Sequence, residues 1–274
     1  MPCSRKLYPT VMLAVTLFGC APQRGAVIVP TAEATLQSDS FTIQSTVLGE
    51  PRLINVFVPA GHAQGPLPVL YMPDGGIDED FPHVVATVDS LITAGAIRPV
   101  MVVGIPNTQR RRDLTGATSV ASDSTVAPRV GESSAFRGFI RAELIPAIER
   151  RYTTTPERAI IGESFAGLFI VETFLHEPAL FQHYIALDPS VWWNAGRLVE
   201  SAGEHVASPV RTGQSLYLAS SREPSTSGGS LRLATVLQGT APQGLRWTYV
   251  PRVDLEHATI FRALKAAALI HALR

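Results

Sequence analysis

The pattern of apolar and polar residues divides the chain into an opening pair of strands and a longer series of alternating strands and helices. Residues 41–47 and 53–58 alternate apolar and polar side chains around a Gly-Glu-Pro turn at residues 49–51, which predicts a β-hairpin. Short apolar runs predict further strands, and apolar residues spaced three or four apart predict helices between them. The expected strands are 68–72, 100–105, 159–161, 184–187, 215–219 and 246–250, and the expected helices are 84–94, 136–152, 165–176, 197–206, 230–238 and a last one from about residue 258.

An antiparallel opening followed by repeated strand and helix units predicts a single α/β domain over residues 41–274. Its central sheet should be mostly parallel and covered by helices on both faces. The polar segment 106–134 has no periodicity, and loops of this length are uncommon inside compact domains. We expect it to be either a disordered excursion or a lid or wall over the functional site.

The first 20 residues have the features of an export signal. A basic pair at residues 5–6 precedes an apolar run, residues 11–18, which Gly19 and Cys20 follow. The run is too short to span a bilayer, because a span needs about 20 apolar residues. The sequence Leu-Phe-Gly-Cys at its end resembles a bacterial lipobox, in which the cysteine is acylated and becomes the first residue of the mature protein.

We therefore expect residues 1–19 to be a lipoprotein-type signal peptide and Cys20 to carry the lipid. Residues 20–40 are rich in Ala, Pro, Thr and Ser and suit a tether between lipid and domain. The protein would then be exported from a bacterial cell and anchored by lipid in the cell envelope, on the periplasmic side or at the outer membrane. The alternative is an ordinary signal peptide cut nearby, or an uncleaved anchor.

Composition narrows the classes of partner. The 274 residues are 46% hydrophobic, which is enough for a sizeable core. Lys and Arg total 23 against 23 Asp and Glu, so the chain lacks the basic excess with which proteins bind nucleic acid. The zero net charge also argues against a pocket for highly charged ligands. The two cysteines, Cys3 and Cys20, both belong to the export segment, so the expected mature body has no disulfide.

A candidate nucleophile lies between a buried strand and an apolar helix. The strand at 159–161 continues into Gly-Glu-Ser-Phe-Ala-Gly at residues 162–167 and then into the helix at 165–176. This strand, turn and helix sequence is the context of a nucleophile elbow, which would place Ser164 at the tip of a strained turn. Strand and helix nearly touch across such a turn, so small residues are needed two positions before and after the serine. Gly162 and Ala166 meet that requirement.

A serine hydroxyl needs a base to take its proton, and histidine has the matching pKa. In this type of fold the base follows the nucleophile and the acid in the chain. Of the seven histidines, His257 lies between the last expected strand and the last expected helix, where the base belongs. A helix-capping histidine is the alternative reading of His257.

The third member of a catalytic triad is an acid that orients the histidine. Its usual place is the loop after the last strand but one, here residues 220–224, and Glu223 is therefore the preferred candidate. Asp188, at the end of the strand 184–187, is a rival, because the acid can move to that neighbouring strand end. Asp254 is a third candidate, although it lies only three residues before His257.

Backbone N–H groups should stabilise the negative charge that develops on the carbonyl oxygen under attack. The amide of Phe165, directly after the nucleophile, is one expected donor of this oxyanion hole. The second should come from the loop after strand 68–72, where Gly75 and Gly76 permit close approach, and Gly76 is favoured. A plain glycine turn explains the same pair.

Three further residues are candidates for substrate binding. Trp192 and Trp193 follow a strand end on the expected catalytic side of the sheet, although a tryptophan is more often core. Arg111 lies in a run of three arginines, residues 110–112, before Asp113. An Arg–Asp pair that pins the long loop is the preferred reading of this run, with substrate binding second. No metal-binding motif and no phosphate-binding loop is evident, so no cofactor is expected.

The residues at 161–169, 178–181 (Pro-Ala-Leu-Phe) and 188–193 (Asp-Pro-Ser-Val-Trp-Trp) resemble the putative-esterase family of α/β-hydrolases, which includes enterobactin-type siderophore esterases and esterase-D-like enzymes. Four shorter blocks, at 71–75, 103–105, 111–115 and 143–146, match in the same order, so the resemblance runs from about residue 40 to the C-terminus. It implies the α/β-hydrolase fold and a serine esterase, with Ser164 as nucleophile and His257 as base.

This sequence departs from the family pattern at three positions. Glu163 stands where the family often has His, Ala166 where it has Gly, and Asp188 where it commonly has Ser. The last of these leaves the choice of acid open. We expect hydrolysis of a small-molecule carboxylic ester through an acyl-enzyme intermediate. An acyltransferase with the same residues, or an envelope protein that only binds its ligand, are the alternatives.

Overall fold

The computed structural model describes residues 38–62, 65–206 and 213–274, besides Met1. The expected signal peptide, Cys20 and residues 20–37 of the expected tether lie outside the described residues. The last three tether residues, 38–40, belong to the first strand instead, so the folded part begins earlier than expected. None of the helices in the described part of the chain is long and apolar enough to cross a membrane.

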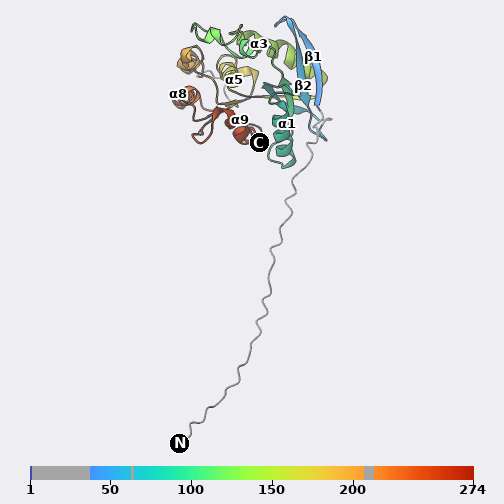
Figure 1. The fold of residues 1–274 in the computed structure, drawn as a ribbon. Helices are drawn as coiled ribbons and strands as arrows, with labels where there is room; N and C mark the ends of the chain where they lie inside the picture. Colours follow the sequence, from blue (N-terminus) through green and yellow to red (C-terminus); the bar gives the residue numbers. More distant parts are fainter. Residues whose placement is uncertain (2–37, 63–64, 207–212) are drawn as a thin grey trace. The chain divides into compact units, whose positions relative to one another are not determined.

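An eight-stranded sheet forms the centre of the domain, in the order β1-β2-β4-β3-β5-β6-β7-β8 (Figure 1). The strands β1 and β2 form the predicted antiparallel hairpin, and β2 is also antiparallel to β4, whereas every other neighbouring pair is parallel. This confirms the predicted fold class. The strands are β1 (Ser38–Ser45), β2 (Glu50–Phe57), β3 (Leu67–Pro73), β4 (Met101–Ile105), β5 (Thr154–Glu163), β6 (His183–Leu187), β7 (Ser215–Ser220) and β8 (Arg246–Pro251).

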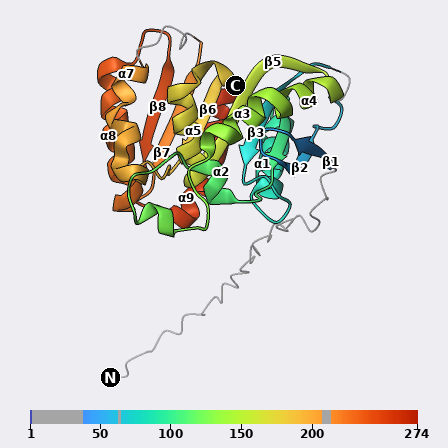
Figure 2. The same ribbon diagram turned by 90° about the horizontal axis from the view of Figure 1, so that it is seen from above.

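Helices cover both faces of the sheet, as expected for parallel strands joined by crossover helices (Figures 1 and 2). The α-helices are α1 (Phe81–Thr93), α2 (Arg110–Leu114), α3 (Ser133–Phe139), α4 (Ile145–Arg151), α5 (Phe165–His176), α6 (Arg197–Glu200), α7 (Ala202–Val206), α8 (Pro224–Thr240) and α9 (His257–Leu273). Short 3₁₀ segments are η1 (Asp123–Thr125), η3 (Pro178–Leu180) and η4 (Trp193–Gly196), and η2 (Ile140–Leu144) is a π-helical turn.

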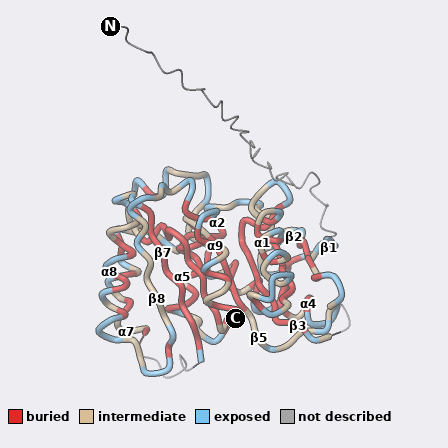
Figure 3. The backbone as a smooth tube through the Cα atoms, turned by 90° about the horizontal axis from the view of Figure 1, so that it is seen from below, coloured by how far each residue is buried: buried red, intermediate tan, exposed pale blue. Residues whose placement is uncertain are grey.

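The core has two layers, one on each face of the sheet, and the buried segments in Figure 3 follow the strands between them. Successive residues of a strand point to opposite faces, so Ile160 of β5 packs with α5 and α8, whereas Ala159 and Ile161 pack with α1 and α9. Fully burying one such aliphatic side chain stabilises the fold by about 1.5–3 kcal/mol. This alternation decides on which face of the sheet each side chain near the end of β5 lies.

Two helices differ from the sequence prediction for identifiable reasons. The expected helix 136–152 is divided into α3, η2 and α4, with the π-helical turn just before Pro146, whose ring lacks an N–H and crowds the preceding turn. Helix α8 begins at Pro224 rather than at residue 230. Its Gly229 looks like a loop residue, but a Cβ there would lie 2.6 Å from Val191 Cγ2, so glycine serves a close helix contact.

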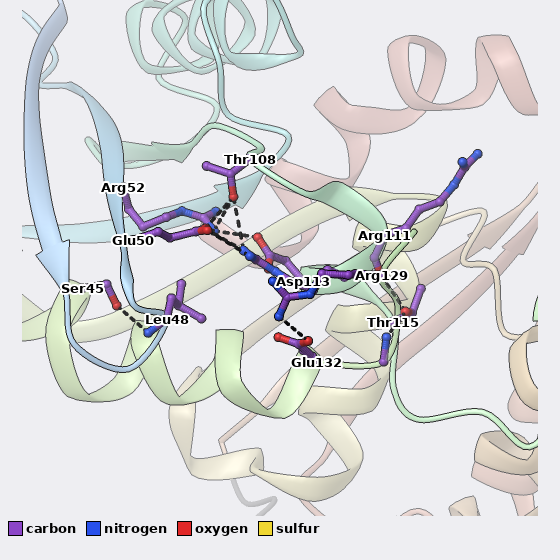
Figure 4. Close-up of polar contacts among 12 residues, drawn as sticks. Ser45, Leu48, Glu50, Arg52, Thr108, Arg111, Asp113, Thr115, Arg129 and Glu132 are labelled. Carbon is purple, nitrogen blue, oxygen red and sulfur yellow. Dashed lines mark hydrogen bonds and ion pairs between the residues drawn. The ribbon is translucent and has the colours of Figure 1, made fainter. Parts of the chain in front are cut away.

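Buried ion pairs attach the start of the long 106–134 segment to the hairpin (Figure 4). Arg52 of β2 donates to Asp113 at 2.6 Å, and both side chains are 1% exposed. Arg112 bonds the other oxygen of Asp113 at 2.6 Å and also reaches Glu50 at 2.6 Å. The hydrogen bond from Arg112 lowers the pKa of Glu50 to about 2. The predicted role of an Arg–Asp pair in pinning this segment is confirmed, with Arg52 as a partner that the sequence did not reveal.

Candidate active site

Three strands end in residues with unusual backbone conformations at the same edge of the sheet. Asp74 follows β3, Ser164 follows β5 and Asp188 follows β6, with φ angles of 56°, 59° and 45°. Residues other than glycine rarely adopt positive φ, and such strain gathers at functional sites. In parallel α/β sheets the carboxyl ends of the strands are also where ligands bind. The candidate site therefore lies at this edge.

The sharp turn between β5 and α5 has the geometry of a nucleophile elbow. Ser164 has φ 59° and ψ −119°, immediately before the first residue of α5. A Cβ on Gly162 would lie 2.6 Å from the Cβ of Ala166, so a larger residue at position 162 would force strand and helix apart. The tight crossing expected from the sequence is present, with Ala166 in place of the usual glycine.

The hydroxyl of Ser164 lies beside a second serine. Its Oγ is 3.3 Å from the Oγ of Ser190, and the amide of Ser190 donates to the carbonyl of Ser164 at 3.0 Å. Ser190 is 3% exposed. Within the described residues Ser164 Oγ has no hydrogen bond to His257, which reaches the same edge from the start of α9. Sequence reasoning did not single out Ser190, because nothing local connects it to residue 164.

His257 pairs with Asp188, not with Glu223. The Nδ1 atom of His257 is 2.6 Å from Oδ2 of Asp188, whose side chain is 0% exposed. Ser221 donates to the same carboxylate twice, from its amide at 2.8 Å and from its hydroxyl at 2.7 Å. Hydrogen bonds from Ser221 and His257 thus hold the buried carboxylate and direct it at the imidazole.

The preference for Glu223 as the acid is corrected by this contact. Glu223 is the N-cap residue of α8 and comes after the end of β7, whereas Asp188 follows β6 directly. Asp254, the third candidate, forms a bidentate ion pair with Arg252 on the surface, with distances of 2.7 and 2.6 Å. Neither Glu223 nor Asp254 has a hydrogen bond to His257 in the described part of the chain.

The pKa values of Asp188 and His257 are shifted in the directions that general-base chemistry needs. Burial raises the pKa of Asp188, but the hydrogen bonds from His257 and Ser221 outweigh it and leave that pKa below its ordinary value. The hydrogen bond to Asp188 raises the pKa of His257 against the opposing effect of burial. Asp188 therefore stays ionised near neutral pH and stabilises the protonated imidazole.

The two expected oxyanion donors differ in availability. Phe165 is the first residue of α5, where the geometry of a helix leaves the amide N–H without an intrahelical partner. The amide of Gly76 instead donates to Oε2 of Glu79 at 2.7 Å, and Oε1 of Glu79 accepts from Asn107 at 2.7 Å. The Gly76 N–H therefore donates to Glu79 in this structure, and its expected role in the oxyanion hole stays a prediction.

Arg110, rather than Arg111, is the arginine beside the elbow. It binds Asp74 with two hydrogen bonds, at 2.7 and 2.8 Å, and its guanidinium lies 5.7 Å from the centre of the Phe165 ring. Arg111 is exposed, bonds the carbonyl of Val126, and points away from the Arg52–Asp113 pair in Figure 4. No contact among the described residues brings Arg111 to Ser164.

The two tryptophans take different positions. Trp193 is 3% exposed and donates from Nε1 to the carbonyl of Gly116 at 2.8 Å, so it joins the 106–134 segment to the core. Trp192 is half-buried, and its ring centre lies 5.9 Å from that of Phe165. Trp193 and Leu168 also line a hollow of about 280 Å³ along α5. The Trp193 contact shows that segment 106–134 packs against the core, and its expected role as a lid or wall over the site stays a prediction.

The described residues hold no cluster of three or more His, Cys, Asp or Glu side chains that could bind a metal ion. The residue that the sequence undervalued is Glu163, which appeared only as a departure from a family pattern. Its pKa is raised to about 7, chiefly by burial. The signal available in advance was its place directly before the nucleophile.

Comparison with known proteins agrees with this geometry. The family described as putative esterase matches residues 45–230. The chain is 27% identical to the ferri-bacillibactin esterase BesA of Bacillus subtilis over 215 residues, which cover 66% of this chain and 71% of that protein. It is 28% identical over 181 residues to the siderophore triacetylfusarinine C esterase of Aspergillus fumigatus, covering 61% of this chain and 60% of that one.

Solved structures give the same result. An IroE-like serine hydrolase from Shewanella oneidensis superposes with a TM-score of 0.77 and 28% identity, covering 86% of this chain and 79% of that one. The BES protein from Bacillus cereus, at 20% identity and a TM-score of 0.78, shares the fold. With the family match over most of the folded part, these findings show that the chain belongs to the putative esterase family of carboxylic ester hydrolases.

Proposed function

We propose that the protein is a serine esterase in which Ser164 is the nucleophile, His257 the general base and Asp188 the orienting acid. The observation that carries the proposal is the 2.6 Å contact between His257 Nδ1 and the buried Asp188 carboxylate, at the edge of the sheet where Ser164 occupies a strained turn. A nucleophile, a base and an acid at adjacent strand ends form the constellation that activates a serine hydroxyl.

The reaction follows from the roles of these groups. Nε2 of His257 takes the proton of the Ser164 hydroxyl as its Oγ attacks the ester carbonyl. Asp188 holds the proton on Nδ1, and so keeps Nε2 free to act as the base. His257 then passes the proton from Nε2 to the leaving alcohol, which gives an acyl-Ser164. A water molecule, deprotonated by His257, attacks this ester and releases the acid, with the proton returning to Ser164.

Two hydrogen bonds in the substrate-free site must be exchanged for others when the substrate binds. The Oγ of Ser164 is bonded to Ser190 and must turn to His257. The Gly76 amide must leave Glu79 to help the Phe165 amide stabilise the oxyanion. Each such donor contributes about 2.7–4 kcal/mol to catalysis in enzymes of this type. Hydrogen bonds of catalytic groups often reach their working geometry only with substrate bound.

The expected substrate is a small-molecule ester. The named relatives are esterases of siderophores, which are iron-chelating small molecules. We propose that this chain also cleaves a siderophore ester, in its iron-free form. At this edge Arg110 pairs with Asp74 and His257 pairs with Asp188, so neither carboxylate is left without a partner. The chain has 23 Lys and Arg against 23 Asp and Glu and therefore no basic excess for a strongly anionic ferric complex, so a neutral ester suits it better.

Covalent labelling tests the proposed mechanism. A fluorophosphonate probe is expected to add one label per chain, found by peptide mass spectrometry on the fragment that contains Ser164. The same preparation should hydrolyse members of a chromogenic ester panel graded by acyl length and aromaticity, and an iron-free siderophore trilactone. A protein that neither labels nor turns over any ester would contradict the proposal, and labelling at another serine would contradict the choice of nucleophile.

We also propose that the protein is exported and lipid-anchored through Cys20, which rests on the sequence alone. The expected result is incorporation of a palmitate analogue when the full-length gene is expressed in a bacterium that processes lipoproteins, and loss of that incorporation in Cys20→Ser. A Cys3→Ser variant is the matched control and should still be labelled. Equal labelling of wild type and Cys20→Ser would overturn the anchor.

A further inference from the structure

Glu163 is the last residue of β5 and directly precedes the nucleophile. Ala159 and Ile161 of this strand face α1 and α9, and the alternation of the strand places Glu163 on the same side. His257 is the first residue of α9, which packs on that face. Glu163 therefore meets the catalytic edge from the α1 and α9 side of β5, whereas Asp188 reaches His257 from the end of β6.

One oxygen of the Glu163 carboxyl group lacks a hydrogen-bond partner among the described residues. This oxygen, Oε1, is buried. Leaving a buried polar atom unpaired costs about 1–3 kcal/mol, so such atoms are uncommon in native folds. A buried, unpaired carboxyl oxygen beside a nucleophile points to a role in the reaction rather than in the fold.

Four charged or titratable groups interact with Glu163, each from a different element. They are His257 from α9, Asp80 from the turn before α1, Asp188 from the end of β6 and Arg110 from α2. Burial is the largest influence and, with the two aspartates, raises the pKa of Glu163, whereas His257 and Arg110 lower it. The result is about 7, so Glu163 changes charge in the range where an esterase base works.

We propose that Glu163 is a second carboxylate partner of His257, a positioning residue that stabilises the imidazolium formed when His257 takes the proton of Ser164. The role rests on the proposed function of Ser164 and His257. The family pattern often has histidine at this position, so Glu163 is a departure of this chain from that pattern. Asp188 sets the tautomer through Nδ1, and Glu163 adds negative charge near the ring without a hydrogen bond of its own.

The sign of the effect follows from the charges that face His257. Asp188, Glu163 and Glu223 all raise the pKa of His257, with the hydrogen bond to Asp188 the largest influence and burial acting against them. Removing the charge of Glu163 therefore lowers the pKa of His257. The acid limb of kcat/KM, which reports the base in the free enzyme, then moves to lower pH. Because Glu163 and His257 titrate together, the wild-type limb should also be broader than that of a single ionisation.

The test compares pH profiles of kcat/KM for a neutral ester in wild type and Glu163→Gln. The acid limb of the variant should move down by about 0.5–1 pH unit and become a single ionisation. Its kcat on the alkaline plateau should fall about 3- to 10-fold, because the imidazolium loses a stabilising charge. Asp78→Asn, which removes an exposed carboxyl from the same edge, is the matched control and should leave the limb in place.

A readout independent of turnover keeps the inference separate from the proposed function. The pKa of His257, measured by NMR with labelled histidine and assigned by difference from His257→Gln, should fall in Glu163→Gln and stay unchanged in Asp78→Asn. A lower kcat in Glu163→Gln with no change in the acid limb or in the pKa of His257 would mean that Glu163 has only a structural role. An equal shift of the limb in Asp78→Asn would mean that the effect comes from the net charge of the protein and not from Glu163 itself. If the wild type were inactive but the pKa of His257 still fell in Glu163→Gln, the esterase mechanism would be contradicted and the coupling between Glu163 and His257 would stand.

Discussion

Replacing Ser164 by alanine is expected to lower kcat by about 10⁴- to 10⁶-fold, to the rate that oxyanion stabilisation and binding alone provide. The physical reason is that Ser164 supplies the hydroxyl at the tip of the strained elbow, and alanine leaves no nucleophile at that position. Alanine removes a single oxygen and adds no bulk, so Tm should change little. The measurement is steady-state hydrolysis of the best ester of the panel, with thermal unfolding recorded on the same samples.

Ser190→Ala is the matched control for this experiment. Its hydroxyl lies 3.3 Å from that of Ser164, and its loss removes the competing hydrogen bond without removing the nucleophile. We expect activity within about 10-fold of wild type, since a neutral hydrogen bond contributes about 0.5–1.5 kcal/mol. If Ser164→Ala kept its activity and Ser190→Ala lost it, the nucleophile would be assigned to the wrong serine.

The elbow was predictable because its signal is local. A buried strand, a turn with small residues at 162 and 166, and an apolar helix are contiguous in the sequence, and the structure reproduces α5 with the predicted boundaries, Phe165–His176. His257 was placed for the same reason, since it lies between a strand and a helix that the pattern showed. Local pattern thus predicted the fold class and the places in the fold of Ser164 and His257, the proposed nucleophile and base.

The acid was not predictable in this way, because its choice depends on which neighbouring strand end lies opposite the imidazole. Both Glu223 and Asp188 follow strands, and only the parallel register of β6 and β7 brings Ser221 to Asp188 and so buries that carboxylate. The hydrogen bond from the Gly76 amide to Glu79 likewise depends on where a side chain lies in the folded protein. Pairwise contacts of this kind carry no periodic signal along the chain.

The choice between the two acids can be measured directly. Asp188→Asn is expected to lower kcat by about 10³- to 10⁴-fold, because an amide at this position can present its NH₂ group to Nδ1 and favour the tautomer that protonates Nε2. The amide oxygen at the Oδ1 position still accepts from the Ser221 N–H, and the NH₂ group at the Oδ2 position can donate to the Ser221 hydroxyl, which turns to accept, so the fold should persist. The profile of kcat against pH, with circular dichroism as a check on folding, is the measurement.

Glu223→Gln is the decisive comparison, because it changes the carboxyl that the sequence favoured and leaves the length of the side chain the same. Glu223 raises the pKa of His257 through its charge, and its effect is smaller than that of Asp188 or Glu163. We therefore expect kcat within about threefold of wild type, since removing one distant, partly solvated charge changes the barrier by less than about 1 kcal/mol. The opposite ranking, a large loss in Glu223→Gln and a small one in Asp188→Asn, would return the acid to the end of β7 and leave the 2.6 Å contact of His257 a structural one.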